Sequence, residues 1–204
     1  VAMTAYYMQD LILEPYAGLI FNYTVKESTQ LSGFQNAGAL IGMVTVGIMC
    51  SIIKIGSLRF WVLVGCILSS ISLAIIGLLG FINLGISLNS IVSFLGFSNG
   101  VFAVAAIGCM MQLAGKGKET REGTRMGLWG ASQAIAAGFG GLVGTGFLDL
   151  SRYFITQDNI SFALVFFLES LLFIFAAFIS LNIKSNEKVE FNLKQLKMVE
   201  NHDI

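Results

Sequence analysis

Long apolar stretches alternate with short polar connections along the chain, and this pattern is its strongest structural signal. A membrane-spanning helix needs about 20 mostly apolar residues, and lipid offers no hydrogen-bond partner to a free backbone group. The first stretch is the least apolar, because it contains Gln9, Asp10 and Glu14. We therefore predict an all-α membrane protein with six transmembrane helices. The six expected spans are 3–23, 31–53, 60–81, 86–114, 127–148 and 162–183.

The spans divide the chain into a membrane domain, residues 1–183, and a polar tail, residues 184–204. The chain opens at Val1 inside a helix-like pattern and without a signal peptide, so we expect it to be a fragment of a longer protein. Ten of the twelve Lys and Arg residues fall in the tail or in the connections after the second and fourth spans. The positive-inside rule places these segments, and the C-terminus, on the cytoplasmic or stromal side. Only Lys26 and Arg152 belong to the opposite side.

Composition narrows the possible functions. Hydrophobic residues make up 55% of the chain and charged residues only 12%, about half the charged fraction of a soluble domain. The net charge is zero, so nucleic acid is not an expected partner. No phosphate loop, metal-binding or nucleophile motif is present, and we do not expect an enzyme. The single histidine, His202, lies in the tail, and the three cysteines lie in apolar runs without the spacing of a metal site.

Two carboxylates in the first span are the clearest candidates for function. Asp10 and Glu14 are one helical turn apart, on a stripe shared with Tyr7 and Gly18. A carboxylate at membrane depth costs a few kcal/mol, so two of them predict an interior or wet surface. Pro15 removes the backbone hydrogen bond to the carbonyl of residue 11, as in the broken helices of transporters. The structural alternative is that these acids cap or pair with another part of the protein.

Amide side chains supply further candidates at membrane depth. Hydrogen bonds between helices account for some of them, and the remainder are expected to line a cavity. Glu169 is a lone carboxylate among phenylalanines, and a functional role and a structural role are equally consistent with it. The candidate ligand-binding or proton-coupling residues are Tyr7, Gln9, Asp10, Glu14, Gln35, Asn36, Asn99, Gln112 and Gln133, and no catalytic or metal-ligating set is predicted.

Small and aromatic residues predict how the helices pack. Three glycine pairs with four-residue spacing each line one helix face and allow close backbone approach: Gly38/Gly42, Gly96/Gly100 and Gly140/Gly144. The sixth span is rich in phenylalanine, and we expect it to be an outer helix whose rings face lipid. These rings are Phe162, Phe166, Phe167, Phe173, Phe175 and Phe178.

Three ordered stretches resemble one family. Residues 8–16 read MQDLILEPY, residues 98–104 read SNGVFAV, and residues 127–136 read GLWGASQAIA. Together they are similar to the PucC-type family, the bacteriochlorophyll-delivery branch of the major facilitator superfamily. The resemblance implies that these six helices are the C-terminal half of a twelve-helix fold, facing a missing N-terminal half in the same or a second chain. It also implies a photosynthetic membrane, with chlorophyll or bacteriochlorophyll as a transient cofactor and antenna or photosystem apoproteins as partners.

Three functions remain open at this point. The first is delivery of pigment to light-harvesting or photosystem apoproteins, with the polar first helix facing the chlorin. The second is a proton-coupled secondary transporter of a small solute that uses Asp10 and Glu14. The third is a structural subunit docked on a photosystem without a ligand of its own. The connection 54–60 lacks the acidic residue of the superfamily's loop motif, which counts against ordinary proton-coupled rocking.

Overall fold

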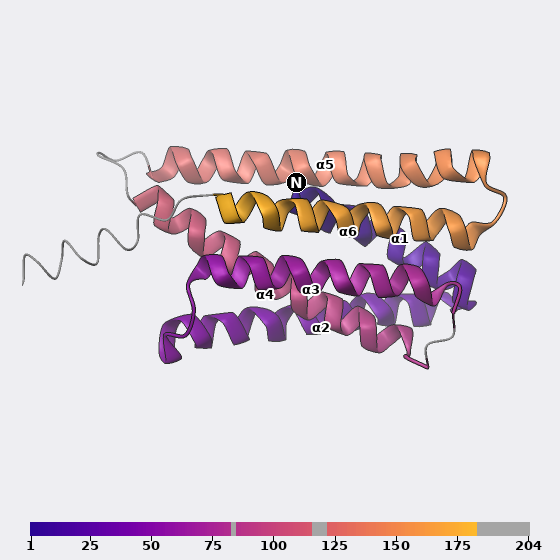
Figure 1. The fold of residues 1–204 in the computed structure, drawn as a ribbon, viewed down its shortest axis with the longest axis horizontal. Coiled ribbons are helices and arrows are strands. Elements are labelled where there is room, and N and C mark those ends of the chain that lie inside the picture. The colour runs from indigo at the N-terminus through magenta and orange to yellow at the C-terminus, as the bar shows by residue number, and fades with distance from the viewer. Residues whose placement is uncertain (83–84, 116–121, 183–204) are drawn as a thin grey trace, which may run out of the picture.

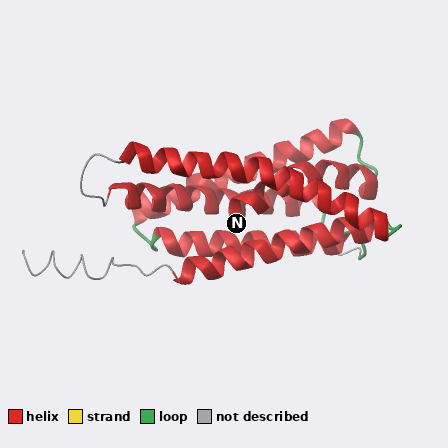
Figure 2. Cartoon of the chain, turned by 90° about the horizontal axis from the view of Figure 1, so that it is seen from above, coloured by secondary structure: helices red, strands yellow, loops and turns green. Residues whose placement is uncertain are grey.

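The computed structural model describes residues 1–82, 85–115 and 122–182. Within these ranges the chain is helical and contains no strand (Figure 2). The polar tail and three of the basic residues used for the orientation, Lys116, Lys118 and Arg121, lie outside the described residues. The elements are α1 (Ala2–Phe21), α2 (Val25–Ile48), the π-helix η1 (Met49–Ile53), α3 (Leu58–Leu79), α4 (Leu88–Gly115), α5 (Glu122–Phe154) and α6 (Asp158–Asn182).

Five stretches of these helices are long and apolar enough to cross a membrane. An all-helical membrane protein is therefore confirmed, whereas a sixth crossing stays a prediction. α1 has 20 residues, about 30 Å of helix, so its polar side chains rather than its length set it apart. The five candidate spans are Val25–Ile53, Leu58–Leu79, Leu88–Gln112, Gly123–Phe154 and Asp158–Leu181.

The second helix begins earlier than its apolar pattern predicts, at Val25 rather than at residue 31. A capping box explains the polar first turn. The Thr24 backbone N–H donates to the Glu27 carboxylate at 2.8 Å, and the Glu27 N–H donates to the Thr24 hydroxyl at 3.4 Å. Just before it, Asn22 adopts the left-handed conformation that ends α1 (φ 55°). The connection between α1 and α2 is therefore a short, well-defined turn.

The helices lie along one long axis and alternate in direction (Figures 1 and 2). α2 packs on α4, α3 packs on α4 and α6, and α1 packs on α5 and α6. The first three helices can be matched in order with the last three: α1 with α4, α2 with α5, and α3 with α6. The α2–α4 contact then corresponds to the α5–α1 contact, and the α3–α4 contact corresponds to the α6–α1 contact. The two three-helix units thus make equivalent contacts, as expected for an internal structural repeat.

The α2–α4 pair is held at very short range by glycine. A Cβ atom on Gly38 or Gly42 would collide with the backbone carbonyl of Ser93 or Phe97 of α4. In the opposite direction, a Cβ on Gly96 or Gly100 would collide with the backbone carbonyls of Gln35 and Ala39. The packing role predicted for these glycines is confirmed.

The equivalent α1–α5 pair uses the third glycine pair. A Cβ on Gly140 would lie 2.6 Å from the carbonyl oxygen of Thr4, and one on Gly144 would lie 3.3 Å from Cβ of Met8. Both halves of the fold therefore place a glycine pair at the corresponding interface, with the glycines on α2 in one half and on α5 in the other.

The expectation that all phenylalanines of α6 face lipid is wrong for half of them. Phe162, Phe166 and Phe173 are fully buried. The first two pack against Tyr16 of α1, with ring centroids 5.4 and 4.9 Å apart. The other three, Phe167, Phe175 and Phe178, are exposed on the far face of the helix.

Tyr16 also fixes α1 against α3 through its hydroxyl, which donates to the carbonyl of Ile76 at 2.6 Å in the buried core. We expect Tyr16→Phe to lower the free energy of unfolding by about 1 kcal/mol, because a buried hydrogen bond is lost without a change in volume. Thermal unfolding in detergent would measure this. Tyr23→Phe is the control, since its hydroxyl makes only a 3.4 Å, partly buried contact with Asn89. An equal loss for both variants would contradict the assignment.

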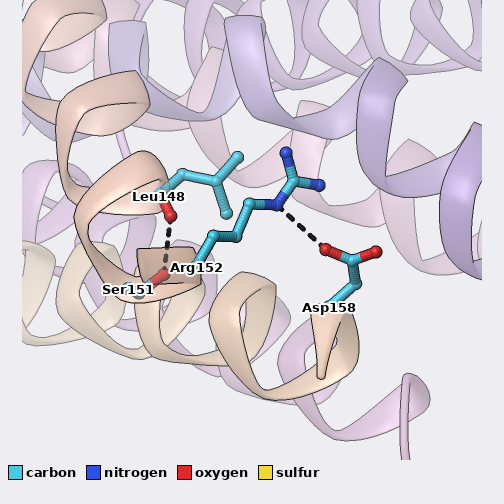
Figure 3. A network of polar contacts seen from close by, with 4 residues as sticks. All are labelled: Leu148, Ser151, Arg152 and Asp158. Atoms are coloured by element: carbon cyan, nitrogen blue, oxygen red, sulfur yellow. Dashed lines mark hydrogen bonds and ion pairs between the residues drawn. The ribbon is translucent and has the colours of Figure 1, made fainter. Parts of the chain in front are cut away.

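The α5–α6 turn is closed by an ion pair (Figure 3). Arg152 Nε lies 2.9 Å from Asp158 Oδ1, and its guanidinium stands 5.0 Å above the ring of Phe162. The Ser151 hydroxyl beside it donates to the carbonyl of Leu148 at 2.8 Å. Arg152 is one of the two basic residues predicted on this side of the membrane, and Asp158 neutralises its charge.

Candidate functional site

α1 has an inward face and an open face. Met8, Ile12 and Tyr16 are fully buried against α5 and α6. Asp10 and Glu14 lie on the exposed side of the helix, as the predicted stripe requires. The two carboxylates therefore share a surface that no described helix covers.

Each carboxylate is held by one polar side chain of α2. The Gln35 side-chain amide donates to Asp10 Oδ1 at 3.1 Å, and the Ser32 hydroxyl donates to Glu14 Oε1 at 2.6 Å. Asp10 and Glu14 are four residues apart on α1, and Gln35 and Ser32 are three residues apart on α2, so the two hydrogen bonds lie about one helical turn apart. We call these two hydrogen bonds the α1–α2 rungs. These hydrogen bonds fix the directions of both carboxylates and leave further lone pairs for a ligand.

Pro15 does not break the helix. α1 continues from Ala2 to Phe21, with Pro15 on its exposed side, so the expected resemblance to a broken transporter helix is wrong. Proline has no N–H, and the carbonyl of Leu11 therefore lacks its usual intrahelical donor. The site gains an additional backbone acceptor on the open face without an interruption of the helix.

An apolar side chain lies beside the acids on the exposed side of α1. Leu11, the residue after Asp10, is 54% exposed. An open surface that combines oriented carboxylates with an apolar side chain suits a ligand with an apolar body and a hard cationic or hydrogen-bonding centre. Among the described residues, no group of three or more His, Cys, Asp and Glu side chains could hold a metal ion.

The other predicted site residues do not all join this surface. Asn36 is exposed beside Gln35, whereas Tyr7 is half-buried and meets Tyr6 edge to face at 5.3 Å. Asn99 is buried between α3 and α4 and accepts from the Ser69 hydroxyl at 2.9 Å, which is a structural contact. Gln9 points into the bundle and is fully buried.

The last two candidates line a separate cavity of about 410 Å³ among α1, α3, α4, α5 and α6. Gln112 is exposed at its wall, and the Gln133 amide lies 3.8 Å from the sulfur of Met3. The lining is mostly apolar and includes Cys66, Phe102 and Trp129. The sequence analysis expected some of the amides to line a cavity but had no signal for the apolar lining, because those residues come from five helices and share no spacing. It likewise missed Ser32, a single hydroxyl in a polar turn.

Comparison with known proteins gives a family. The chain matches the family described as PUCC protein over residues 1–188. It is 58% identical over 182 residues to the "Bacteriochlorophyll synthase 44.5 kDa chain" of Rhodobacter capsulatus, covering 89% of this chain and 42% of the relative. It is 32% identical over 166 residues to "Protein PucC" of Cereibacter sphaeroides, covering 72% of this chain and 32% of that protein.

A third relative, the "Uncharacterized protein in puhA-bchM intergenic region" of Rhodobacter capsulatus, is 27% identical over 166 residues, covering 74% of this chain and 30% of the relative. The chain thus spans less than half the length of these relatives. No solved structure matches it. The family match extends over all six helices and both carboxylates of the open face, and the chain belongs to the PUCC protein family.

Proposed function

We propose that this chain is part of a non-catalytic membrane protein that delivers bacteriochlorophyll or chlorophyll to light-harvesting or photosystem apoproteins. The observation that carries the proposal is the match to the PUCC protein family over residues 1–188. The relative that is 58% identical has bacteriochlorophyll in its name, which supports a pigment as the ligand. The protein would act in a thylakoid or bacterial photosynthetic membrane.

The fold proposed for this role is half of a twelve-helix major-facilitator protein. The equivalent contacts of the two three-helix units support it, because such folds are built from repeats of this kind. In this arrangement α1 also crosses the membrane, in addition to the five candidate spans. Its open face meets an N-terminal half in the same or a second chain. The relatives are long enough to contain that half, since the chain covers 42% of the first one. The C-terminal tail would lie on the cytoplasmic or stromal side.

The open face fits a chlorin in its chemistry. When bound, a chlorin supplies a flat apolar ring around a magnesium ion, which prefers hard oxygen donors. Asp10 and Glu14 offer such oxygens, and Gln35 and Ser32 hold them in place. Leu11 presents apolar surface beside them. These residues would bind and orient the pigment without the histidine found at many pigment and metal sites.

A proton-coupled transporter of a small solute is the second candidate. The repeated three-helix arrangement and two carboxylates on an open helix face favour it. In that case Asp10 and Glu14 would carry the coupled protons. Uptake into proteoliposomes would then depend on a pH gradient and would be abolished by Asp10→Asn or Glu14→Gln. A structural photosystem subunit would need neither carboxylate.

Purification in mild detergent from the native photosynthetic membrane tests the proposal. We expect the intact protein to show chlorophyll or bacteriochlorophyll absorption and to bring antenna or photosystem subunits with it. Stable comigration with photosystem subunits but no pigment would favour the structural role instead. A colourless protein without photosynthetic partners would overturn the delivery proposal and leave the transporter.

A further inference from the structure

Three fully buried side chains have no hydrogen-bond partner among the described residues: Gln9 of α1, and Ser161 and Glu169 of α6. Gln9 of α1 and Glu169 of α6 are both 0% exposed. Neither the amide nitrogen nor the amide oxygen of Gln9 is hydrogen-bonded, and neither oxygen of Glu169 is. A buried polar group without a partner is costly, and one on each of two packed helices needs an explanation.

The register of the helices places the two side chains opposite each other. α1 and α6 run antiparallel and are in contact (Figure 1). Tyr16 stands against Phe162 and Phe166, which sets the register. Gln9 precedes Tyr16 by two turns on the same face, and Glu169 follows Phe162 by two turns. Both side chains therefore face the α1–α6 interface at the same depth, near the middle of each helix.

Neighbouring polar groups bond mainly to one another, although the amide nitrogen of Asn99 has no partner among the described residues. The hydroxyls of Ser70 and Ser170 are 2.8 Å apart, and the Ser170 hydroxyl also donates to the carbonyl of Ser70 at 3.0 Å. Ser69 donates to Asn99 at 2.9 Å. These pairs tie α3 to α6 and to α4, and they leave Gln9 as the polar side chain that α1 presents at the depth of Glu169.

Among the described residues, no cation lies at the depth of Glu169 in the bundle. The spans of α1, α4 and α6 contain no Lys, Arg or His, and the α3 and α5 cations (Arg59, Arg125, Arg152) lie near helix ends. Asp10, the residue after Gln9, is itself an acid and supplies no countercharge. A lone carboxylate at membrane depth is disfavoured by a few kcal/mol. Counting described side chains only, the ionisable groups on the helices packed against α6 are Tyr6, Tyr7, Asp10, Glu14 and Tyr16 on α1, Arg59 and Cys66 on α3, and Arg125, Asp149, Arg152 and Tyr153 on α5. α4 touches α6 through the rings of Phe102 and Phe173, and its one ionisable group is Cys109.

We propose that Gln9 and Glu169 form a proton-binding site between α1 and α6. The protonated Glu169 carboxyl donates its O–H to the Gln9 amide oxygen, directly or through one water, and this form keeps the two helices packed. On release, the O–H bond breaks, the proton passes to water at the open face beside Asp10, and the carboxylate that remains requires hydration. Because Gln9 and Asp10 are consecutive, any opening of the α1–α6 interface also moves the carboxylates of the open face. The site is independent of whether the open face binds a pigment.

Infrared spectroscopy of the intact protein in lipid bilayers tests the site. At neutral pH we expect the carbonyl band of a protonated carboxylic acid, which an ionised carboxylate does not give. Glu169→Gln, a neutral isostere that preserves packing, should abolish this band. Glu14→Gln is the matched control and should leave it in place. Absence of the band at neutral pH, or its survival in Glu169→Gln, would overturn the proposal.

A second variant tests the partner. Gln9→Leu retains the size of the side chain and removes its hydrogen-bonding atoms. The carboxylic acid band should then shift to higher frequency, because the carboxyl has lost its acceptor. A band that stays at the wild-type frequency in Gln9→Leu would show that Glu169 does not pair with Gln9. Sodium added at constant pH should leave the band unchanged, whereas its disappearance would identify a cation site instead of a proton site.

Discussion

Gly42→Ala is expected to lower the free energy of unfolding by about 1–3 kcal/mol, the usual cost of inserting a methyl group into a closely packed interface. The new Cβ would collide with the carbonyl oxygen of Phe97 and lie 3.0 Å from the backbone nitrogen of Val101. Both atoms belong to the helix backbone of α4, so they cannot move aside as a flexible side chain would. The helices have to separate instead.

Separation also weakens the contacts that the glycines make. The Cα hydrogen that occupies the Cβ direction in glycine points at the partner carbonyl, a geometry worth about 0.5–1 kcal/mol for each contact. Gly38, Gly96 and Gly100 make the same kind of approach on this interface. A single added methyl group at Gly42 therefore disturbs its neighbours, and the loss is expected at the upper end of the range.

Gly47→Ala on the same helix is the matched control. A Cβ at Gly47 has no atom within 4 Å, so the substitution adds a methyl group without a collision. It should be neutral or slightly stabilising, since alanine favours the helix over glycine by up to about 1 kcal/mol. Thermal or denaturant unfolding in detergent would compare the two. Equal stability of both variants would show that α2 and α4 are not as close as the structure places them.

The helices themselves could be predicted from the apolar runs, but their ends could not. α2 begins with the polar residues of a capping box, and α5 extends on both sides of its predicted span, from Glu122 to Phe154. Hydropathy measures suitability for lipid, whereas a helix continues as long as its backbone hydrogen bonds and caps allow. Polar end turns are therefore helical without being apolar.

The spacing of the phenylalanines along α6, rather than their number, indicates which of them share a face of the helix. Phe162, Phe166 and Phe173 fall on one side of a 3.6-residue period and are buried, whereas Phe167, Phe175 and Phe178 fall on the opposite side and are exposed. A count of phenylalanines merges these two sets. The periodicity indicates two faces, but which of them is buried depends on where Tyr16 packs.

The open face was predictable for α1 and less so for α2. The four-residue spacing of Asp10 and Glu14 places them together, and Gln35 was a candidate by its polarity. Ser32 was not, because its position opposite Glu14 depends on how α2 sits against both α1 and α4. Consecutive residues of a helix point about 100° apart, which explains why Gln9 lies in the core although Asp10 lies on the surface.

The combined variant Asp10→Asn/Glu14→Gln is expected to reduce co-purified pigment about tenfold or more. Each substitution keeps the size of the side chain and removes a charged acceptor, and a hydrogen bond to a charged group contributes about 1.5–3 kcal/mol. The variant should fold as well as the wild type, because both side chains are on the open face and their α2 partners are polar. Pigment per protein, measured by absorption after mild purification, gives the result.

Asp149→Asn is the control for charge alone, since Asp149 is an exposed carboxylate near the end of α5, away from the α1–α2 rungs. Its pigment content should match the wild type. The single variants then separate the two rungs: a larger loss in Asp10→Asn would place the ligand nearer Gln35, and a larger loss in Glu14→Gln would place it nearer Ser32. Pigment content that is unchanged in the combined variant would exclude the open face as the binding surface, even for a protein that carries pigment. The binding residues would then have to be sought elsewhere, with the apolar cavity lined by Gln112 and Gln133 as the next surface to mutate.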